Sequence, residues 1–198
     1  MAMMSKNRLE AFSDGVLAII ITIMVLELKI PHGAELSALK PLIPIFLSYV
    51  LSFVYVGIYW NNHHHMLHTV QHVNGVMLLA NLHLLFWLSL IPFVTGWMGE
   101  NHFAAVPSAL YGFVLLMSAA AYFILQHTIL RDQGKNSLLA RAIGVDIKGK
   151  ISLFLYFSAI GLSFYYEFLA QALYALVAMM WLVPDTRIEK TIENKLDQ

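Results

Sequence analysis

Cysteine is absent from this chain of 198 residues, so disulfides, thiolate metal sites and thiol nucleophiles are excluded. Charge is scarce as well. Charged residues make up 12% of the chain, whereas a soluble domain carries roughly 25%. Acidic and basic residues balance to a net charge of zero, which leaves no basic surface for a nucleic acid partner.

Motifs of soluble enzymes are missing too: the sequence has no Walker A pattern, no G-x-G-x-x-G before a strand and no H-E-x-x-H. A cleavable signal peptide is not expected, because the first apolar segment has acids in its flank and no small-residue cleavage site. The polar residues inside the apolar segments are too few for an intramembrane enzyme; they are Ser48, Ser52, Asn81, His83 and Ser158. We therefore expect no enzymatic activity, no cofactor and no bound metal.

Apolar residues dominate instead, at 59% of the chain with a mean hydropathy of +0.68, which indicates that the protein lies in a lipid bilayer. A membrane helix needs about 20 mostly apolar residues. The sequence predicts an all-α membrane protein with six transmembrane helices, forming one domain over residues 1–184 before a charged cytoplasmic tail over 185–198. The expected helices are 8–30, 39–60, 73–97, 103–130, 147–166 and 168–183.

The distribution of lysine and arginine predicts the orientation, since cytoplasmic segments carry an excess of both. If the N-terminus is cytoplasmic, the outer segments hold only Lys29 and Lys40. All other basic residues are then inside: Lys6, Arg8, Arg131, Lys135, Arg141, Lys148, Lys150, Arg187, Lys190 and Lys195. We therefore expect a multi-pass protein of the cell membrane with both termini in the cytoplasm.

The first helix carries the most informative pattern. At 100° per residue, its aliphatic stripe lies within about 40° of one line. Ser13 and Asp14 point about 120–140° away from Ile19 at the same rotation per residue. A stripe of this kind is compatible with a surface against lipid or another helix, and Asp14 with simple hydration at the membrane edge. The members of the aliphatic stripe are Phe12, Gly15, Ile19, Ile23, Leu26 and Ile30.

The charged start of this helix resembles a known family. Arg8, Phe12, Ser13 and Asp14 match the pattern Arg-x-x-x-Phe-Ser-Asp on the first helix of the transmembrane protein 175 family, which contains lysosomal potassium channels and bacterial homologues. Weaker similarity lies at residues 59–64 and 89–93. The resemblance implies a potassium-preferring cation channel without a TVGYG filter, a segment that this sequence indeed lacks.

The resemblance also implies a site. Four chains are expected to form a homotetramer in the bilayer, with the first helix of each lining a pore for potassium ions. The narrowest ring would then be Ile19, with further layers from Thr22, Ile23 and Leu26. Ser13 and Asp14 would face their own subunit, and Arg8 would tether neighbouring subunits. The candidate partners of Ser13 and Asp14 are Trp60, His63, His64 and Asn81.

A histidine cluster supports an alternative function. The cluster is expected in the loop between the second and third helices, and His64 and His68 are spaced to share one helical face, which suits zinc or nickel. A secondary transporter or metal-ion carrier using this cluster therefore stays open beside the channel. The simpler reading is a solvated cytoplasmic turn. The members are His63, His64, His65, His68 and His72.

Overall fold

The computed structural model describes residues 5–134, 137, 139–140 and 146–182, so the expected tail over 185–198 lies outside the described residues. Every regular element within the described ranges is helical, which confirms the all-α fold. In chain order these are α1 (Lys6–Leu26), η1 (Leu36–Leu42), α2 (Ile43–His68), α3 (Gly75–Ser89), α4 (Ile91–Glu100), α5 (Ala105–Gln133), α7 (Ile147–Leu162) and α8 (Glu167–Leu182).

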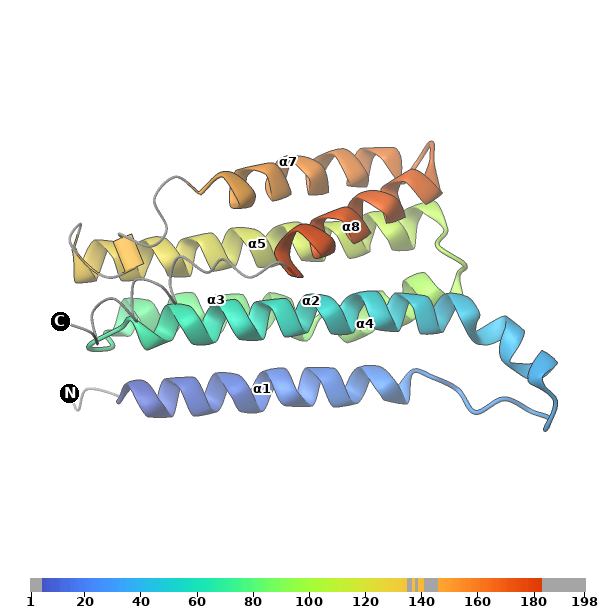
Figure 1. Cartoon of the computed structure of the whole chain (residues 1–198), viewed down its shortest axis with the longest axis horizontal. Helices are drawn as coiled ribbons and strands as arrows, with labels where there is room; N and C mark the ends of the chain where they lie inside the picture. The colour runs from blue at the N-terminus through green and yellow to red at the C-terminus, as the bar shows by residue number, and fades with distance from the viewer. Residues whose placement is uncertain (1–4, 135–136, 138, 141–145, 183–198) are drawn as a thin grey trace.

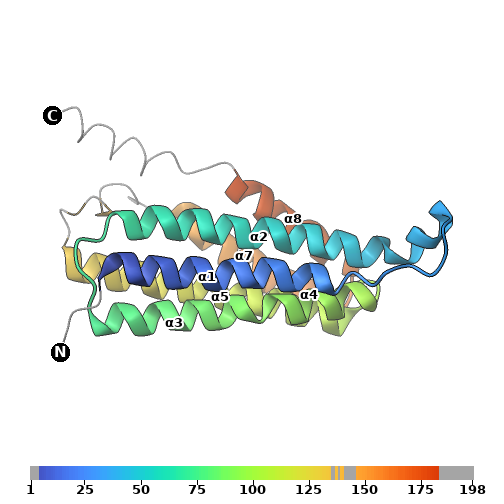
Figure 2. The same cartoon turned by 90° about the horizontal axis from the view of Figure 1, so that it is seen from below.

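The helices form an elongated bundle with α1 at one edge (Figure 1). α1 packs against α2, α3 and α4, while α5 packs against α3, α4, α7 and α8. Turned by 90°, the view shows α1 between α2 on one side and α3 with α4 on the other (Figure 2). The segment joining α1 to α2 extends beyond the bundle and contains η1 (Figure 2). The first helix is therefore supported from behind and left open on its outer side.

Four segments are long and apolar enough to cross a bilayer: Lys6–Leu26, Leu36–His68, Gly75–Glu100 and Ala105–Gln133. α7 and α8 have 16 residues each, or about 24 Å at the rise of an α-helix. The third expected helix is divided, because α3 ends at Ser89 and α4 begins at Ile91. Pro92 in the first turn of α4 explains the break, since its ring clashes with the preceding turn of a continuous helix.

Several expected boundaries were wrong. α2 continues through the histidine cluster to His68, so only His72 of the cluster lies in the loop between α2 and α3. α1 ends at Leu26, which places Ile30 beyond the helix. α5 continues to Gln133 rather than ending near residue 130. α2 and α5 run past their expected ends because residues at a membrane edge meet water. There a helix can continue through polar side chains, so the end of an apolar run does not mark the end of the helix.

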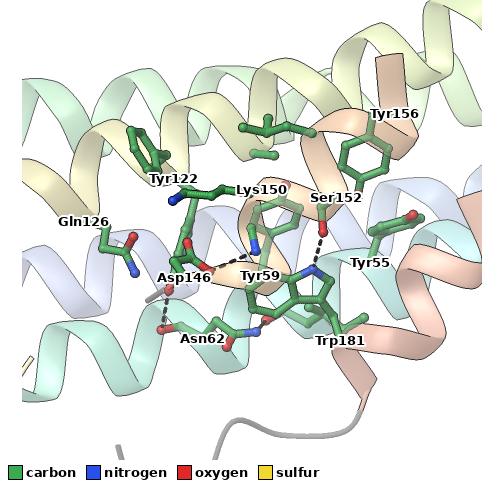
Figure 3. A pocket seen from close by; sticks show the side chains of 15 residues that line it. Tyr55, Tyr59, Asn62, Tyr122, Gln126, Asp146, Lys150, Ser152, Tyr156 and Trp181 are labelled. Carbon is green, nitrogen blue, oxygen red and sulfur yellow. Dashed lines mark hydrogen bonds between the residues drawn. The ribbon is translucent and has the colours of Figure 1, made fainter. Parts of the chain in front are cut away.

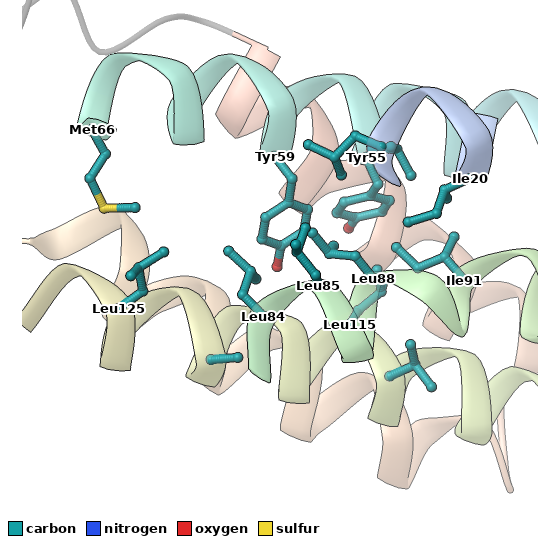
Figure 4. Close-up of a cluster of buried hydrophobic side chains, with 14 of the residues drawn as sticks. Ile20, Tyr55, Tyr59, Met66, Leu84, Leu85, Leu88, Ile91, Leu115 and Leu125 are labelled. Atoms are coloured by element: carbon teal, nitrogen blue, oxygen red, sulfur yellow. The ribbon is translucent and has the colours of Figure 1, made fainter. Parts of the chain in front are cut away.

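A pocket lies between α2, α5, α7 and α8 (Figure 3). Buried aliphatic and aromatic side chains form the core of the described helices, and those from α1 to α5 are shown in Figure 4. Hydroxyl groups join helices within it: Ser52 of α2 lies 2.6 Å from Thr95 Oγ1 of α4 and 3.0 Å from Tyr111 Oη of α5. In lipid, where apolar contact brings little net gain, such packing and interhelical hydrogen bonds hold helices together.

Candidate pore helix and its anchors

The outer side of α1 is uncovered. Ile19 is 59% exposed and Leu26 is 77% exposed, and Ile23 lies between them on the same open side. Only 28% of the apolar window of α1 is buried, the lowest share of the four spans. Thr22 is exposed on this side as well, and its hydroxyl donates to the Ile19 carbonyl at 2.9 Å. That bond uses the hydroxyl proton, so the oxygen of Thr22 keeps its lone pairs for accepting.

A directed chain of hydrogen bonds occupies the opposite, buried side of α1. His63 Nε2 lies 2.7 Å from Asn81 Oδ1, and Asn81 Nδ2 donates to Ser13 Oγ at 3.0 Å. Ser13 Oγ in turn donates to the Leu9 carbonyl at 2.9 Å. Because an amide oxygen only accepts, His63 Nε2 carries the proton in this arrangement. The chain joins α2, α3 and α1, and its three polar side chains are buried.

Two further contacts join α1 to α2 on either side of this chain. Trp60 Nε1 donates to Asp14 Oδ1 at 3.1 Å. One turn away, His64 Nδ1 lies 2.9 Å from Glu10 Oε1, and the His64 ring stacks on Trp60 with centroids 6.4 Å apart. The structure thus brings Ser13, Asp14, Trp60, His63 and Asn81 together. We call these residues, with Glu10 and His64, the anchor face.

Glu10 is the member that sequence reasoning missed. The sequence predicts His64 as a partner of Ser13 or Asp14, yet the His64 ring contacts Glu10. The sequence spacing could have indicated this contact. Glu10 and Asp14 are four residues apart on α1 and therefore share a helical face. Trp60 and His64 have the same spacing on α2, so the two pairs can face each other. Arg8 and Phe12 do not join the anchor face, since both are exposed on α1.

The clustered histidines have separate partners. His63 bonds Asn81, His64 contacts Glu10, and His72 Nε2 lies 2.9 Å from Asp132 Oδ2 of α5. Across the described residues, no group of three or more histidine, cysteine or carboxylate side chains is arranged to hold a metal ion. The geometry therefore gives no support to the metal-ion carrier.

Charged residues gather just beyond the other end of α1. Lys29 pairs with Glu100 at the end of α4. The hydrogen bond and the negative charge of Glu100 raise the pKa of the Lys29 ammonium above its ordinary value. Glu27 packs beside Gly96, where a Cβ would lie 3.1 Å from the carboxylate of Glu27. This end of α1 thus presents carboxylates to the surrounding solution.

Comparisons with known proteins agree with this geometry. The sequence profile of the family described as endosomal/lysosomal potassium channel TMEM175 matches residues 8–92. A potassium channel of Chryseobacterium sp. strain P1-3 is 58% identical over 191 residues, which cover 96% of this chain and 100% of that one. The human endosomal/lysosomal proton channel TMEM175 is 38% identical over 96 residues, 42% of this chain and 19% of its own length.

A solved structure gives the same result for the fold. The crystal structure of a lysosomal potassium-selective channel TMEM175 homologue from Chamaesiphon minutus matches with a TM-score of 0.79 and 27% identity, covering 91% of this chain and 97% of that chain. These relatives are channels of a membrane family and not members of an enzyme family. The chain described here belongs to the TMEM175 family of membrane channels.

Proposed function

We propose that this chain is one subunit of a potassium-preferring cation channel whose pore is lined by α1. The observation that carries the proposal is the two-sided character of α1. Its anchor face is hydrogen-bonded within the subunit, while Ile19, Ile23 and Leu26 stand uncovered on the other side. Three bacterial relatives are named as potassium channels, which supports potassium as the preferred ion.

The proposed constriction is a ring of Ile19 side chains, with Thr22, Ile23 and Leu26 forming further layers. A ring of branched aliphatic side chains gates a pore by dewetting, because it offers water no hydrogen bonds. Potassium gives up its hydration shell more readily than sodium, so a narrow apolar ring favours potassium modestly. The outward lone pairs of Thr22 supply weak oxygen ligands next to this ring. No TVGYG filter takes part.

The anchor face sets the position of α1 in this proposal. Ser13 and Asp14 do not touch the ion; they bind Asn81 and Trp60 of the same subunit and hold the tilt of α1. A small change of tilt moves all the members of the ring together and alters its width. Arg8, exposed at the start of α1, is placed to bind a neighbouring subunit.

A pore of this kind requires several copies of the chain. Each subunit supplies one α1, and a single helix cannot surround a pore, so the subunits form a closed ring. We propose a homotetramer in the cell membrane with both termini in the cytoplasm. The mass of the purified complex, measured by native mass spectrometry, tests the tetramer directly.

The channel itself is tested in a planar bilayer with potassium on one side and sodium on the other. The proposal predicts a current that reverses toward the potassium equilibrium potential, and a larger, less selective current for Ile19→Asn. Leu79→Asn is the matched control, because Leu79 is also exposed, at 69%, but lies on α3. Equal permeability to sodium and potassium, or reversal that follows a pH gradient instead, would overturn the ion preference.

A further inference from the structure

The segment between α1 and α2 stands apart from the bundle. We call residues 27–42 the arm; it runs from the end of α1 through η1 and extends beyond the rest of the bundle (Figure 2). Gly33, with a φ of 129°, lies at its bend, and the Glu35 carbonyl accepts a hydrogen bond from the Ala38 N–H at 2.9 Å. The arm thus has a defined backbone shape, although no residue of η1 is buried.

η1 is an unusual helix to stand without support. It is a 3-10 helix of seven residues, whereas runs longer than about 3–4 residues are uncommon because the hydrogen-bond geometry is poor. Its main packing partner is α2, the helix into which it continues. Short helices without tertiary packing are marginal in water. η1 therefore needs a surface to pack against, and its own chain supplies little of one.

The open side of η1 carries a row of leucines. Leu36, Leu39 and Leu42 are spaced three apart, and side chains at this spacing align on a 3-10 helix. Leu36 is 84% exposed and Leu39 is 48% exposed, so the first two members of the row are open to the surroundings. We call these three residues the leucine ridge. An exposed apolar row of this kind favours contact with another surface.

The hydrocarbon core of the bilayer does not cover the leucine ridge. His64 contacts Glu10, which as a charged group belongs at the edge of the hydrocarbon. From His64 back to Ile43, α2 extends about 32 Å at the rise of an α-helix, which already matches the roughly 30 Å of the hydrocarbon core. At the other end of the bundle, a Cβ on Gly99 would lie 2.7 Å from the Ile45 Cα, so α4 ends close to the level of Ile45. η1 precedes both positions on α2 and therefore lies beyond the hydrocarbon.

The nearest surface is the arm of a neighbouring copy. This step rests on the proposed function, in which the uncovered sides of α1 surround a pore. The arm begins directly after α1, so the arms of successive subunits lie at the same height around the mouth of that pore. In a closed ring of more than two subunits, each subunit meets the next head to tail, so that one side of an arm contacts a different side of its neighbour.

Two opposite charges on the arm fit this arrangement. Glu35 lies just before η1 and Lys40 lies near its end, and both are exposed. Within the described residues, neither side chain has an ion-pair partner. About 10 Å separates the two positions along a 3-10 helix. A carboxylate at one end and an ammonium group at the other become complementary when one arm meets the next head to tail.

We propose that the arms of neighbouring subunits pack against one another and form a collar around the mouth of the pore. The leucine ridge of each arm contacts the next arm, and Lys40 of one subunit pairs with Glu35 of its neighbour. The partner of this surface is thus a second copy of the chain. The collar stabilises the ring at a level that the hydrocarbon core does not reach.

A pair of introduced cysteines tests the contact, because the chain has none of its own. Glu35→Cys and Lys40→Cys are combined in one chain, and the purified oligomer is oxidised. Within one subunit the two positions are too far apart for a disulfide, which needs Cα atoms within about 7 Å. We expect a ladder of covalent dimers, trimers and tetramers on a non-reducing gel, and at most dimers from either single variant.

Glu35→Cys combined with Val106→Cys is the matched control. Val106 is exposed at the start of α5, outside the arm. This pair should give no trimers or tetramers. A ladder of equal intensity in the control would show that the cysteines react by random collision, and it would overturn the proposed contact.

A second measurement tests the leucine ridge. Leu36→Gln should lower the temperature at which the oligomer dissociates on gel filtration, because it places a polar group in the apolar contact. Tyr165→Gln is its control, since Tyr165 is 81% exposed and lies outside the arm, after α7. The control should dissociate at the same temperature as the unmodified protein.

The two measurements separate the collar from the channel. An oligomer that forms no ladder and dissociates at the same temperature in both glutamine variants would overturn the collar and leave the proposed channel intact. Native mass spectrometry that finds only single chains would overturn the proposed function itself, and the collar with it.

Discussion

Trp60 Nε1 donates a hydrogen bond of 3.1 Å to Asp14 Oδ1 and so ties α2 to the start of α1. The bond lies on the side of α1 that faces its own subunit, away from Ile19, which stands 59% exposed. In the proposed channel, one side of α1 holds the helix in its own subunit and the other side lines the pore. This division leads to different expected results for mutations on the two sides.

Replacing Asp14 by alanine removes the acceptor of the Trp60 indole. We expect Asp14→Ala to lower assembly or open probability while leaving the potassium-to-sodium ratio unchanged, because the side chain holds α1 and does not touch the ion. Asp14→Asn keeps an acceptor oxygen and should retain most of the activity. Single-channel recording and bi-ionic reversal potentials measure the two quantities. Normal assembly with an altered ion ratio would contradict this role.

Asn81 should matter more for stability than Ser13. Asn81→Leu leaves both the His63 donor and Ser13 Oγ without their partner in a buried site, at a cost of about 1–3 kcal/mol. Ser13→Ala breaks one interhelical hydrogen bond and leaves only the Asn81 NH₂ group without its partner, at a cost of about 1 kcal/mol. Thermal unfolding in detergent, followed by the loss of the oligomer on gel filtration, ranks the two variants. The reverse order would show that the chain of hydrogen bonds is not centred on Asn81.

Gly99 allows α2 and α4 to approach closely. A Cβ at this position would lie 2.7 Å from the Ile45 Cα and 2.4 Å from Ser48 Oγ. Since backbone cannot move aside without separating the helices, Gly99→Ala should destabilise the protein by about 1–3 kcal/mol. Gly57→Ala is the matched control, because nothing lies within 4 Å of the added Cβ. Similar unfolding temperatures for the two variants would refute the close packing.

The proposed orientation gives a labelling pattern. The chain has no cysteine, so a single introduced thiol is unique. In intact cells, a membrane-impermeant maleimide should label Lys40→Cys, which lies in the segment after α1, and should label Arg187→Cys only after the cells are opened. If Arg187→Cys reacts first, the protein has the opposite orientation.

The sequence predicts the anchor face well because its members are rare polar residues in apolar helices. Ser13, Asp14 and Asn81 each need a partner in lipid, and few candidates exist. The contact between Glu10 and His64 was not predicted, because Glu10 at the membrane edge could also be hydrated. Its partner depends on how α1 and α2 are aligned, and a hydropathy pattern does not carry that alignment.

The end of α2 shows a second limit. Residues 61–68 are polar and rich in histidine, so an apolar criterion ends the helix at Trp60, but the structure continues it to His68. There, hydrogen bonds along the helix, contacts with α1 and α3, and the buried side chains of Met66 and Leu67 hold the last turns. Pro92, by contrast, marks the division between α3 and α4 in the sequence, because its effect on the backbone is local.

The most direct test of the central claim, that the uncovered side of α1 lines the pore, is thiol accessibility during conduction. Leu26→Cys, Ile23→Cys and Leu79→Cys are each treated with a charged methanethiosulfonate reagent while the current is recorded. The account predicts that the current falls for the two α1 variants, because their thiols face water in the pore, and that it is unchanged for Leu79→Cys on α3. Unchanged currents for both α1 variants, with an effect at Leu79, would place the pore elsewhere.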